Sequence, residues 1–160
     1  MEIAAKKTVD LLIAKGIKIA TAESCTGGLV AKLITDVSGA SSVFDCGIVS
    51  YSNEIKAAVL GVSPDTLSSF GAVSEETVIE MSEGVRKLSG ADVTVAISGI
   101  AGPSSDSTDK PVGLIWLAVN YNGKITTKKL QNSFTENIRE NNRNTAAKQA
   151  LELVCKVLKD

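Results

Sequence analysis

The stretch that decides the fold is IKIATAESCTGGLVAKLITDV, residues 17–37, in which one apolar run passes through a polar, glycine-containing turn into another. Residues 17–22 have the length and composition of a short strand. A helix is expected from about Gly27 to Val37, because its apolar residues recur at helical spacing. A strand that leads directly into a helix is the unit from which layered α/β folds are built.

The segments on both sides of this stretch continue the alternation. The sequence predicts further helices over residues 3–15, about 52–60, 74–88 and 136–158, and further strands over residues 43–51, 92–98, 113–120 and about 124–134. Asn122-Gly123, between the last two strands, is a strong signal for a two-residue hairpin. The expected fold class is α/β: a three-layer α/β/α sandwich with a mixed β-sheet and a late antiparallel hairpin, formed by one domain over residues 1–160.

Composition and charge exclude several classes of protein. The 160 residues carry 17 Lys+Arg and 18 Asp+Glu, so the formal net charge of −1 argues against a nucleic-acid partner. No apolar run approaches the roughly 18 residues of a membrane span, and the start of the chain lacks the apolar core of a signal peptide. The three cysteines form no C-x-x-C pair, which favours reduced thiols. We therefore expect a cytoplasmic protein that does not bind membranes.

The chain contains no histidine. A Ser-His-Asp triad, a Cys-His dyad and a histidine-ligated zinc site are all excluded within one chain. Acid–base chemistry near neutral pH would have to use a lysine, tyrosine, cysteine or carboxylate with a shifted pKa.

The turn TAESCTGG, residues 21–28, is the first candidate for chemistry. Ser24 would stand at the carboxyl edge of the sheet, where open α/β folds bind ligands. The following helix start offers backbone N–H groups, and the glycines allow a close approach, as in an oxyanion hole or a phosphate cradle. Taken alone, this local pattern favours a helix cap and a tight turn, because capping serines are common.

Three further segments have both a functional and a purely structural interpretation. In YSNEIK, residues 51–56, Lys56 with a lowered pKa and Tyr51 as a relay could activate a serine, or Lys56 could be a solvated helix residue. The glycine-containing loop of residues 99–111 could form a ligand wall or a simple connection. Arg139 and Arg143, spaced i, i+4, could clamp a phosphate or lie on a solvated helix face.

Four motifs in the same order together resemble the CinA C-terminal domain family over essentially the whole chain: TAESCTGG (21–28), YSNxxK (51–56), GAVS (71–74) and SGIAGP (98–103) continuing to KPVG (110–113). The enzymatic members are nicotinamide-nucleotide amidohydrolases, which are serine enzymes that need no metal or cofactor. The resemblance implies that nicotinamide mononucleotide is deamidated to nicotinic acid mononucleotide and ammonia. It also implies a stand-alone form and a homo-oligomer.

The resemblance assigns the following roles. Ser24, Tyr51 and Lys56 would be catalytic, with Ser24 as the nucleophile and Lys56 as its base, directly or through Tyr51. Cys25, Thr26, Gly27 and Gly28 would form the oxyanion or substrate-binding turn. The pyridine mononucleotide would also contact Asn53, Gly102, Arg139 and Arg143.

The sequence departs from the family pattern in two places. Ser104-Ser105-Asp106-Ser107 stands where members usually have Gly-Gly, and residues 134–139 are one residue longer than usual and lack a glycine. The first departure motivates an alternative, a catalytically silent nucleotide-binding or protein-interaction module of the same fold. A second alternative makes Cys25 the nucleophile, since its thiol also lies near a helix start.

Overall fold

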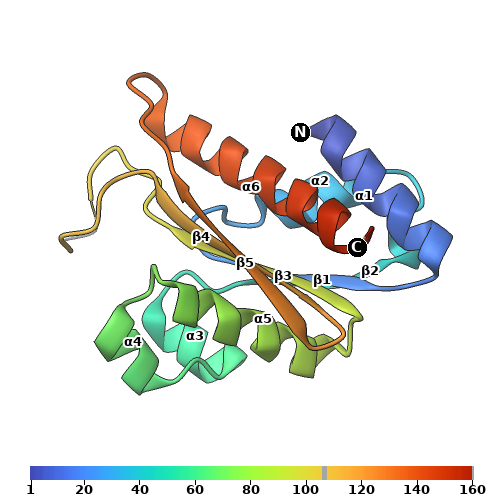
Figure 1. The fold of residues 1–160 in the computed structure, drawn as a ribbon, viewed down its shortest axis with the longest axis horizontal. Coiled ribbons are helices and arrows are strands. Elements are labelled where there is room, and N and C mark those ends of the chain that lie inside the picture. The colour runs from blue at the N-terminus through green and yellow to red at the C-terminus, as the bar shows by residue number, and fades with distance from the viewer. Residues whose placement is uncertain (106–107, 160) are drawn as a thin grey trace.

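The computed structural model describes residues 1–105 and 108–159; Asp106 and Ser107 of the departing loop, and Asp160, lie outside this description. In these residues the elements are α1 (Glu2–Lys15), β1 (Ile19–Glu23), α2 (Leu29–Thr35), η1 (Ala40–Ser42), β2 (Phe44–Val49), α3 (Asn53–Leu60), α4 (Pro64–Phe70), α5 (Glu75–Ser89), β3 (Val93–Gly99), β4 (Leu114–Tyr121), β5 (Lys124–Gln131) and α6 (Ile138–Val157) (Figure 1).

The strands form one mixed sheet in the order β2-β1-β3-β4-β5. Strand β1 pairs in parallel with both β2 and β3, whereas β3–β4 and β4–β5 are antiparallel. Asn122 and Gly123 join β4 to β5 with φ values of 51° and 91°, as a two-residue hairpin turn requires. The predicted α/β fold with a mixed sheet and a late hairpin is confirmed.

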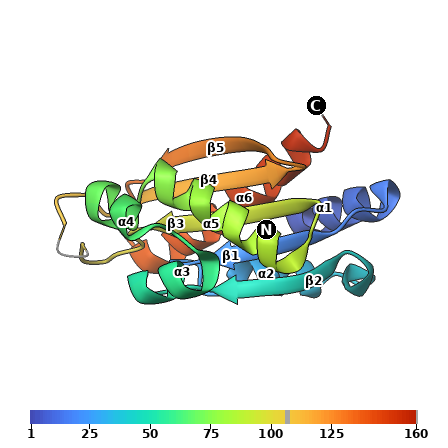
Figure 2. The same ribbon diagram turned by 90° about the horizontal axis from the view of Figure 1, so that it is seen from below.

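Helices cover both faces of this sheet. Helices α1, α2 and α6 lie on one face, and α3, α4 and α5 lie on the other (Figures 1 and 2). One buried apolar cluster fills the space under α1, α2 and α6, and a second lies between the sheet and α5. Each fully buried leucine, isoleucine or valine in these clusters contributes roughly 1.5–3 kcal/mol to folding. None of the helices in the described part of the chain has the length and apolar character needed to cross a membrane.

Two features of the helical layers were not predicted. Helix α4 has no buried residue, so the sequence shows no apolar periodicity that would predict it. Its sequence signal is the helix-start pattern Ser63-Pro64-Asp65, with Ser63 as N-cap. The second is the close crossing of α3 and α5. An ideal Cβ on Gly84 of α5 would lie 1.9 Å from the carbonyl oxygen of Leu60, so only glycine fits there.

Helix α2 begins at Leu29, two residues later than expected. Gly27 and Gly28 have φ values of +60° and +93°, so both belong to the loop between β1 and α2. The carboxyl ends of three adjacent parallel strands, β1, β2 and β3, therefore open onto loops at one edge of the sheet. This is the edge at which open α/β sheets bind ligands.

Candidate active site

Ser24 follows the last residue of β1 and lines a cavity of about 690 Å³. Its backbone N–H donates to the carbonyl of Ile97 on β3, at 3.0 Å, which fixes the residue at the sheet edge. Its side chain is 8% exposed. Ser24 is thus a largely buried residue of the cavity lining, held directly after the end of a strand.

Lys56 reaches this hydroxyl from α3. Ser52 caps the helix by accepting from the Ile55 N–H, which places Lys56 on its inner face, where it is 1% exposed. The Lys56 Nζ lies 3.0 Å from the Ser24 Oγ, 2.8 Å from the Ser50 carbonyl oxygen and 3.2 Å from the Tyr51 carbonyl oxygen. The two carbonyls can only accept, so they take two of the amine's hydrogens. In the neutral amine the lone pair is then left to face Ser24.

Burial also makes that neutral form accessible. It lowers the pKa of Lys56 from 10.5 to about 8, because an ammonium loses hydration inside the protein. No carboxylate forms an ion pair with Lys56 among the described residues. A buried lysine with a pKa near ambient pH, hydrogen-bonded to a serine, has the properties of a general base paired with a nucleophile.

The loop after Ser24 is held by bonds within itself. The Gly27 N–H donates to the Ser24 carbonyl at 3.0 Å, and the Gly28 N–H donates to the Glu23 carboxylate at 3.1 Å. These two amides are occupied, contrary to the expectation that they face a substrate. The amides of Cys25 and Thr26 donate to no oxygen of residues 1–105 or 108–159, and Cys25 lines the cavity beside Ser24.

Arg139 and Tyr51 bridge one side of the cavity. The Arg139 Nη2 donates to the Tyr51 hydroxyl at 2.9 Å, and its Nη1 donates to the Gly102 carbonyl at 3.0 Å. All three residues line the cavity, together with Asn53 and Ser104. The Tyr51 hydroxyl, on a side chain that is 59% exposed, is thus bonded to Arg139, while Lys56 contacts Ser24 without a relay.

The profile of the CinA C-terminal domain matches residues 1–158 of the chain. The chain belongs to the CinA C-terminal domain family. A CinA-like protein of Kosmotoga olearia is 52% identical over 150 residues, which are 94% of this chain and 36% of that protein. The chain thus spans about a third of the length of this relative. A protein of Enterobacter agglomerans named nicotinamide-nucleotide amidohydrolase PncC is 53% identical over 121 residues, 75% of this chain and 74% of that one.

Solved structures agree with this assignment. A CinA superfamily protein from Klebsiella pneumoniae superposes with a TM-score of 0.93 at 37% identity, covering 99% of this chain and 97% of its own. A competence/damage-inducible protein from Agrobacterium tumefaciens superposes with a TM-score of 0.93 at 38% identity, covering 99% of this chain and 95% of its own. The α/β fold expected for the CinA domain is therefore shown.

The environment of Cys25 in this CinA domain argues against a thiolate nucleophile. The side chain is 5% exposed, and burial raises the pKa of its thiol to about 12, more than its own backbone amide lowers it. A cysteine nucleophile acts as the thiolate, which is scarce at neutral pH when the pKa is this high.

Arg139 and Arg143, which were predicted to act as a pair, lie in different parts of the site. Arg139 lines the cavity, whereas Arg143 lies behind the nucleophile loop and donates from Nη2 to the Thr26 carbonyl at 2.8 Å. Gly27, Gly28 and Thr26 likewise lie outside the described cavity lining. The expectation that both arginines reach one phosphate does not match this arrangement.

Two buried polar residues that support the site were missed. The Glu23 carboxylate accepts three N–H groups at the start of α2, from Gly28, Val30 and Ala31, at 2.8–3.1 Å. Asn142, 1% exposed, donates to the Ala101 carbonyl at 3.0 Å. Two sequence signals could have indicated these roles. Glu23 is a carboxylate shortly before a glycine-containing helix start, and Asn142 is an asparagine on the inner face of a helix.

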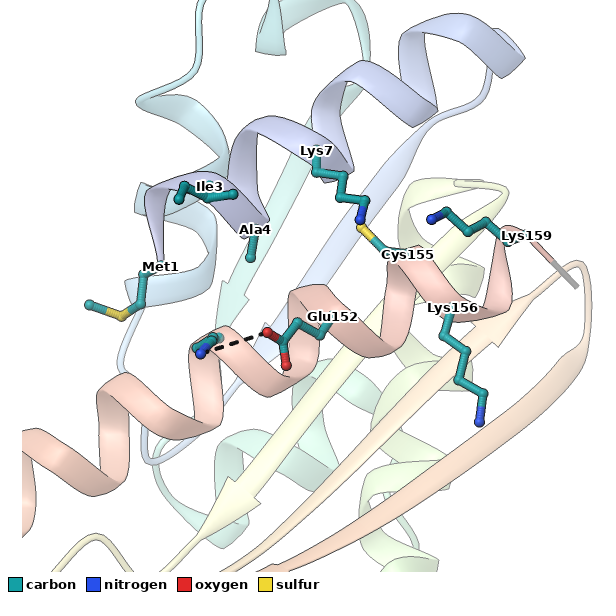
Figure 3. A pocket seen from close by; sticks show the side chains of 9 residues that line it. Met1, Ile3, Ala4, Lys7, Glu152, Cys155, Lys156 and Lys159 are labelled. Carbon is teal, nitrogen blue, oxygen red and sulfur yellow. Dashed lines mark ion pairs between the residues drawn. The ribbon is translucent and has the colours of Figure 1, made fainter.

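A second cavity, of about 600 Å³, lies between α1 and the C-terminal part of α6 (Figure 3). Lys7 of α1 and Lys156 and Lys159 near the end of α6 are among the residues that line it. Its cysteine, Cys155, is buried with its sulfur 3.2 Å from the Thr8 hydroxyl. The described residues that line it include no serine, threonine or tyrosine, so the nucleophile–base pair belongs to the cavity at the sheet edge.

Proposed function

We propose that this CinA domain is a serine amidohydrolase that deamidates nicotinamide mononucleotide to nicotinic acid mononucleotide and ammonia. The observation that carries the proposal is the 3.0 Å contact between the buried Lys56 amine and the Ser24 hydroxyl, two residues that line the same cavity. The name of the Enterobacter agglomerans relative supports this substrate class.

In the first half of the proposed reaction, the neutral Lys56 amine accepts the Ser24 proton as the oxygen attacks the carboxamide carbon. The backbone N–H of Cys25 faces the developing oxyanion, a contact of a kind worth about 3–4 kcal/mol in serine hydrolases. The Lys56 ammonium then returns its proton to the leaving nitrogen. The C–N bond breaks, ammonia leaves, and an ester links the pyridine carbonyl to Ser24.

In the second half, water replaces ammonia. Lys56, neutral again, accepts a proton from the water as the oxygen attacks the ester carbon. The proton passes to the Ser24 oxygen as the ester breaks, and nicotinic acid mononucleotide, once its acid proton is lost to solvent, leaves as the carboxylate. Arg139 is proposed to hold the phosphate, because it is the arginine that lines the cavity and its guanidinium retains N–H groups beyond the two that bind Tyr51 and Gly102.

The test is ammonia release from nicotinamide mononucleotide by the wild type and three variants. Ser24→Ala and Lys56→Met should each reduce the rate at least about 1,000-fold, since nucleophile and base act as a unit. Cys25→Ala removes the thiol of the alternative nucleophile and leaves the backbone amide in place, so most of the activity should remain if Ser24 attacks the substrate. Full ammonia release by Ser24→Ala contradicts the proposal. Calorimetric binding of the mononucleotide by a wild type that releases no ammonia supports the silent binding module instead.

A further inference from the structure

The N-terminal half of α6 donates three hydrogen bonds to two loops of the site, the loop after β3 and the loop after β1. Arg139 donates to Gly102, Asn142 donates to Ala101, and Arg143 donates to Thr26 in the nucleophile loop. Helix α6 lies on the same face of the sheet as α2, whose start this loop forms (Figure 1). Of the three contacts, the one made by Arg143 bears most directly on Ser24.

Arg143 packs closely against the back of this loop. Its Nη2 lies 2.8 Å from the Thr26 carbonyl oxygen and would be 3.6 Å from a Cβ placed on Gly27. Its Nε is buried and has no hydrogen-bond partner among the described residues. None of the ion pairs found in residues 1–105 and 108–159 includes it, so its charge is not neutralised by a bridging carboxylate.

Two planar peptide units connect Arg143 to the amide beside the nucleophile. The Thr26 carbonyl that Arg143 holds shares one plane with the Gly27 N–H. That N–H donates to the Ser24 carbonyl at 3.0 Å, and the Ser24 carbonyl shares the next plane with the Cys25 N–H. In a trans peptide the carbonyl and the N–H point in opposite directions. The Ser24 carbonyl points into the loop, so the Cys25 N–H points out of it.

We infer that Arg143 is a positioning residue for catalysis: by fixing the Thr26 carbonyl it orients the Cys25 amide as the oxyanion donor. This inference rests on the proposed function. Burial and the Glu23 carboxylate raise the pKa of the Cys25 thiol, and the Arg143 guanidinium is close enough to oppose them. Arg143 therefore acts through the loop, whereas Arg139 acts on the substrate.

The experiment compares Arg143→Gln and Arg143→Lys with Arg139→Gln and with Lys148→Gln, an exposed residue further along α6. Two readouts are needed: kcat and KM for ammonia release from nicotinamide mononucleotide, and the rate at which phenylmethylsulfonyl fluoride modifies Ser24, followed by intact mass. The second readout does not depend on the natural substrate. Thermal unfolding shows which variants are folded at the assay temperature.

Arg143→Gln should lower both kcat and the rate of Ser24 modification about ten-fold or more, as expected for a misplaced oxyanion donor. KM should change less than about three-fold, and Arg143→Lys should restore part of the loss. Arg139→Gln should show the opposite split, with a raised KM and an unchanged modification rate. If Arg143→Gln does not fold, Arg143→Lys is tested in its place. It should lower kcat and the rate of Ser24 modification by a smaller factor, with KM little changed.

An Arg143 variant with normal kcat and normal Ser24 modification contradicts the inference but leaves the proposed function standing. A raised KM at normal kcat also contradicts it, because Arg143 would then bind substrate. A wild type whose Ser24 is modified but which releases no ammonia contradicts the proposed function instead. In that case the modification rates of the variants still decide the role of Arg143.

Discussion

Replacing Lys56 with methionine should change the pH dependence of stability by a predictable amount. Burial lowers the pKa of Lys56 from 10.5 to about 8 in the folded protein, so between these values the unfolded chain binds the proton and the folded chain does not. Stability therefore rises with pH across that interval. Below pH 8 both states are protonated, and the folded state bears the full cost of the buried ammonium, about 3 kcal/mol.

Between pH 7 and pH 10 the wild type should regain about 2–3 kcal/mol of this cost, and Lys56→Met should regain none of it. The measured quantity is the free energy of unfolding in urea at both pH values, followed by the fluorescence of Trp116, the single tryptophan. The hydrogen bonds lost by Lys56→Met cancel in the difference between the two pH values, as does the titration of the other groups. Lys87→Met, at an exposed position on α5, is the control. If the stability difference between the wild type and Lys56→Met is the same at pH 7 and pH 10, the pKa of Lys56 is not lowered by folding.

Three other predictions follow from particular contacts. Gly84→Ala should lower the free energy of unfolding by more than about 2 kcal/mol, because its Cβ would meet the Leu60 carbonyl; an unchanged melting temperature contradicts this. Glu23→Gln should cost about 1–3 kcal/mol in urea unfolding, because an amide has one acceptor oxygen for the three N–H groups that the carboxylate serves; the exposed Glu83→Gln should cost nothing measurable. Arg139→Gln should raise KM for nicotinamide mononucleotide about ten-fold or more, from the loss of a charged hydrogen bond; a normal KM places the phosphate elsewhere.

The fold was largely predictable because its elements are signalled locally. Asn122-Gly123 specifies the hairpin, and the glycines after Lys15, Leu60 and Ser89 end their helices in left-handed conformations, as helix C-caps do. Helix α4 was missed because a short helix with no buried face has no apolar periodicity. Local patterns thus predict the elements that have a buried face, but not a short helix that lacks one.

The site was predictable in its parts and not in its connections. The absence of histidine left lysine among the candidate bases. The loop after β1 supplied Ser24, and helix α3, which follows β2, supplied Lys56. The hydrogen bonds that decide the other roles join residues far apart in sequence, such as Arg139 with Tyr51 and Arg143 with Thr26. No rule based on sequence spacing predicts these hydrogen bonds. The homo-oligomer and the cytoplasmic location remain predictions.

The most direct test of the account is a titration of the Lys56 amine itself. Nitrogen-15 NMR of side-chain amines, with the Lys56 signal assigned from its absence in Lys56→Met, gives the midpoint at which the group loses its proton. If Lys56 is the base, its midpoint lies at about pH 8 and its signal is perturbed in Ser24→Ala. A midpoint near 10.5, with a signal indifferent to Ser24, would show an ordinary charged lysine and contradict its role as the base.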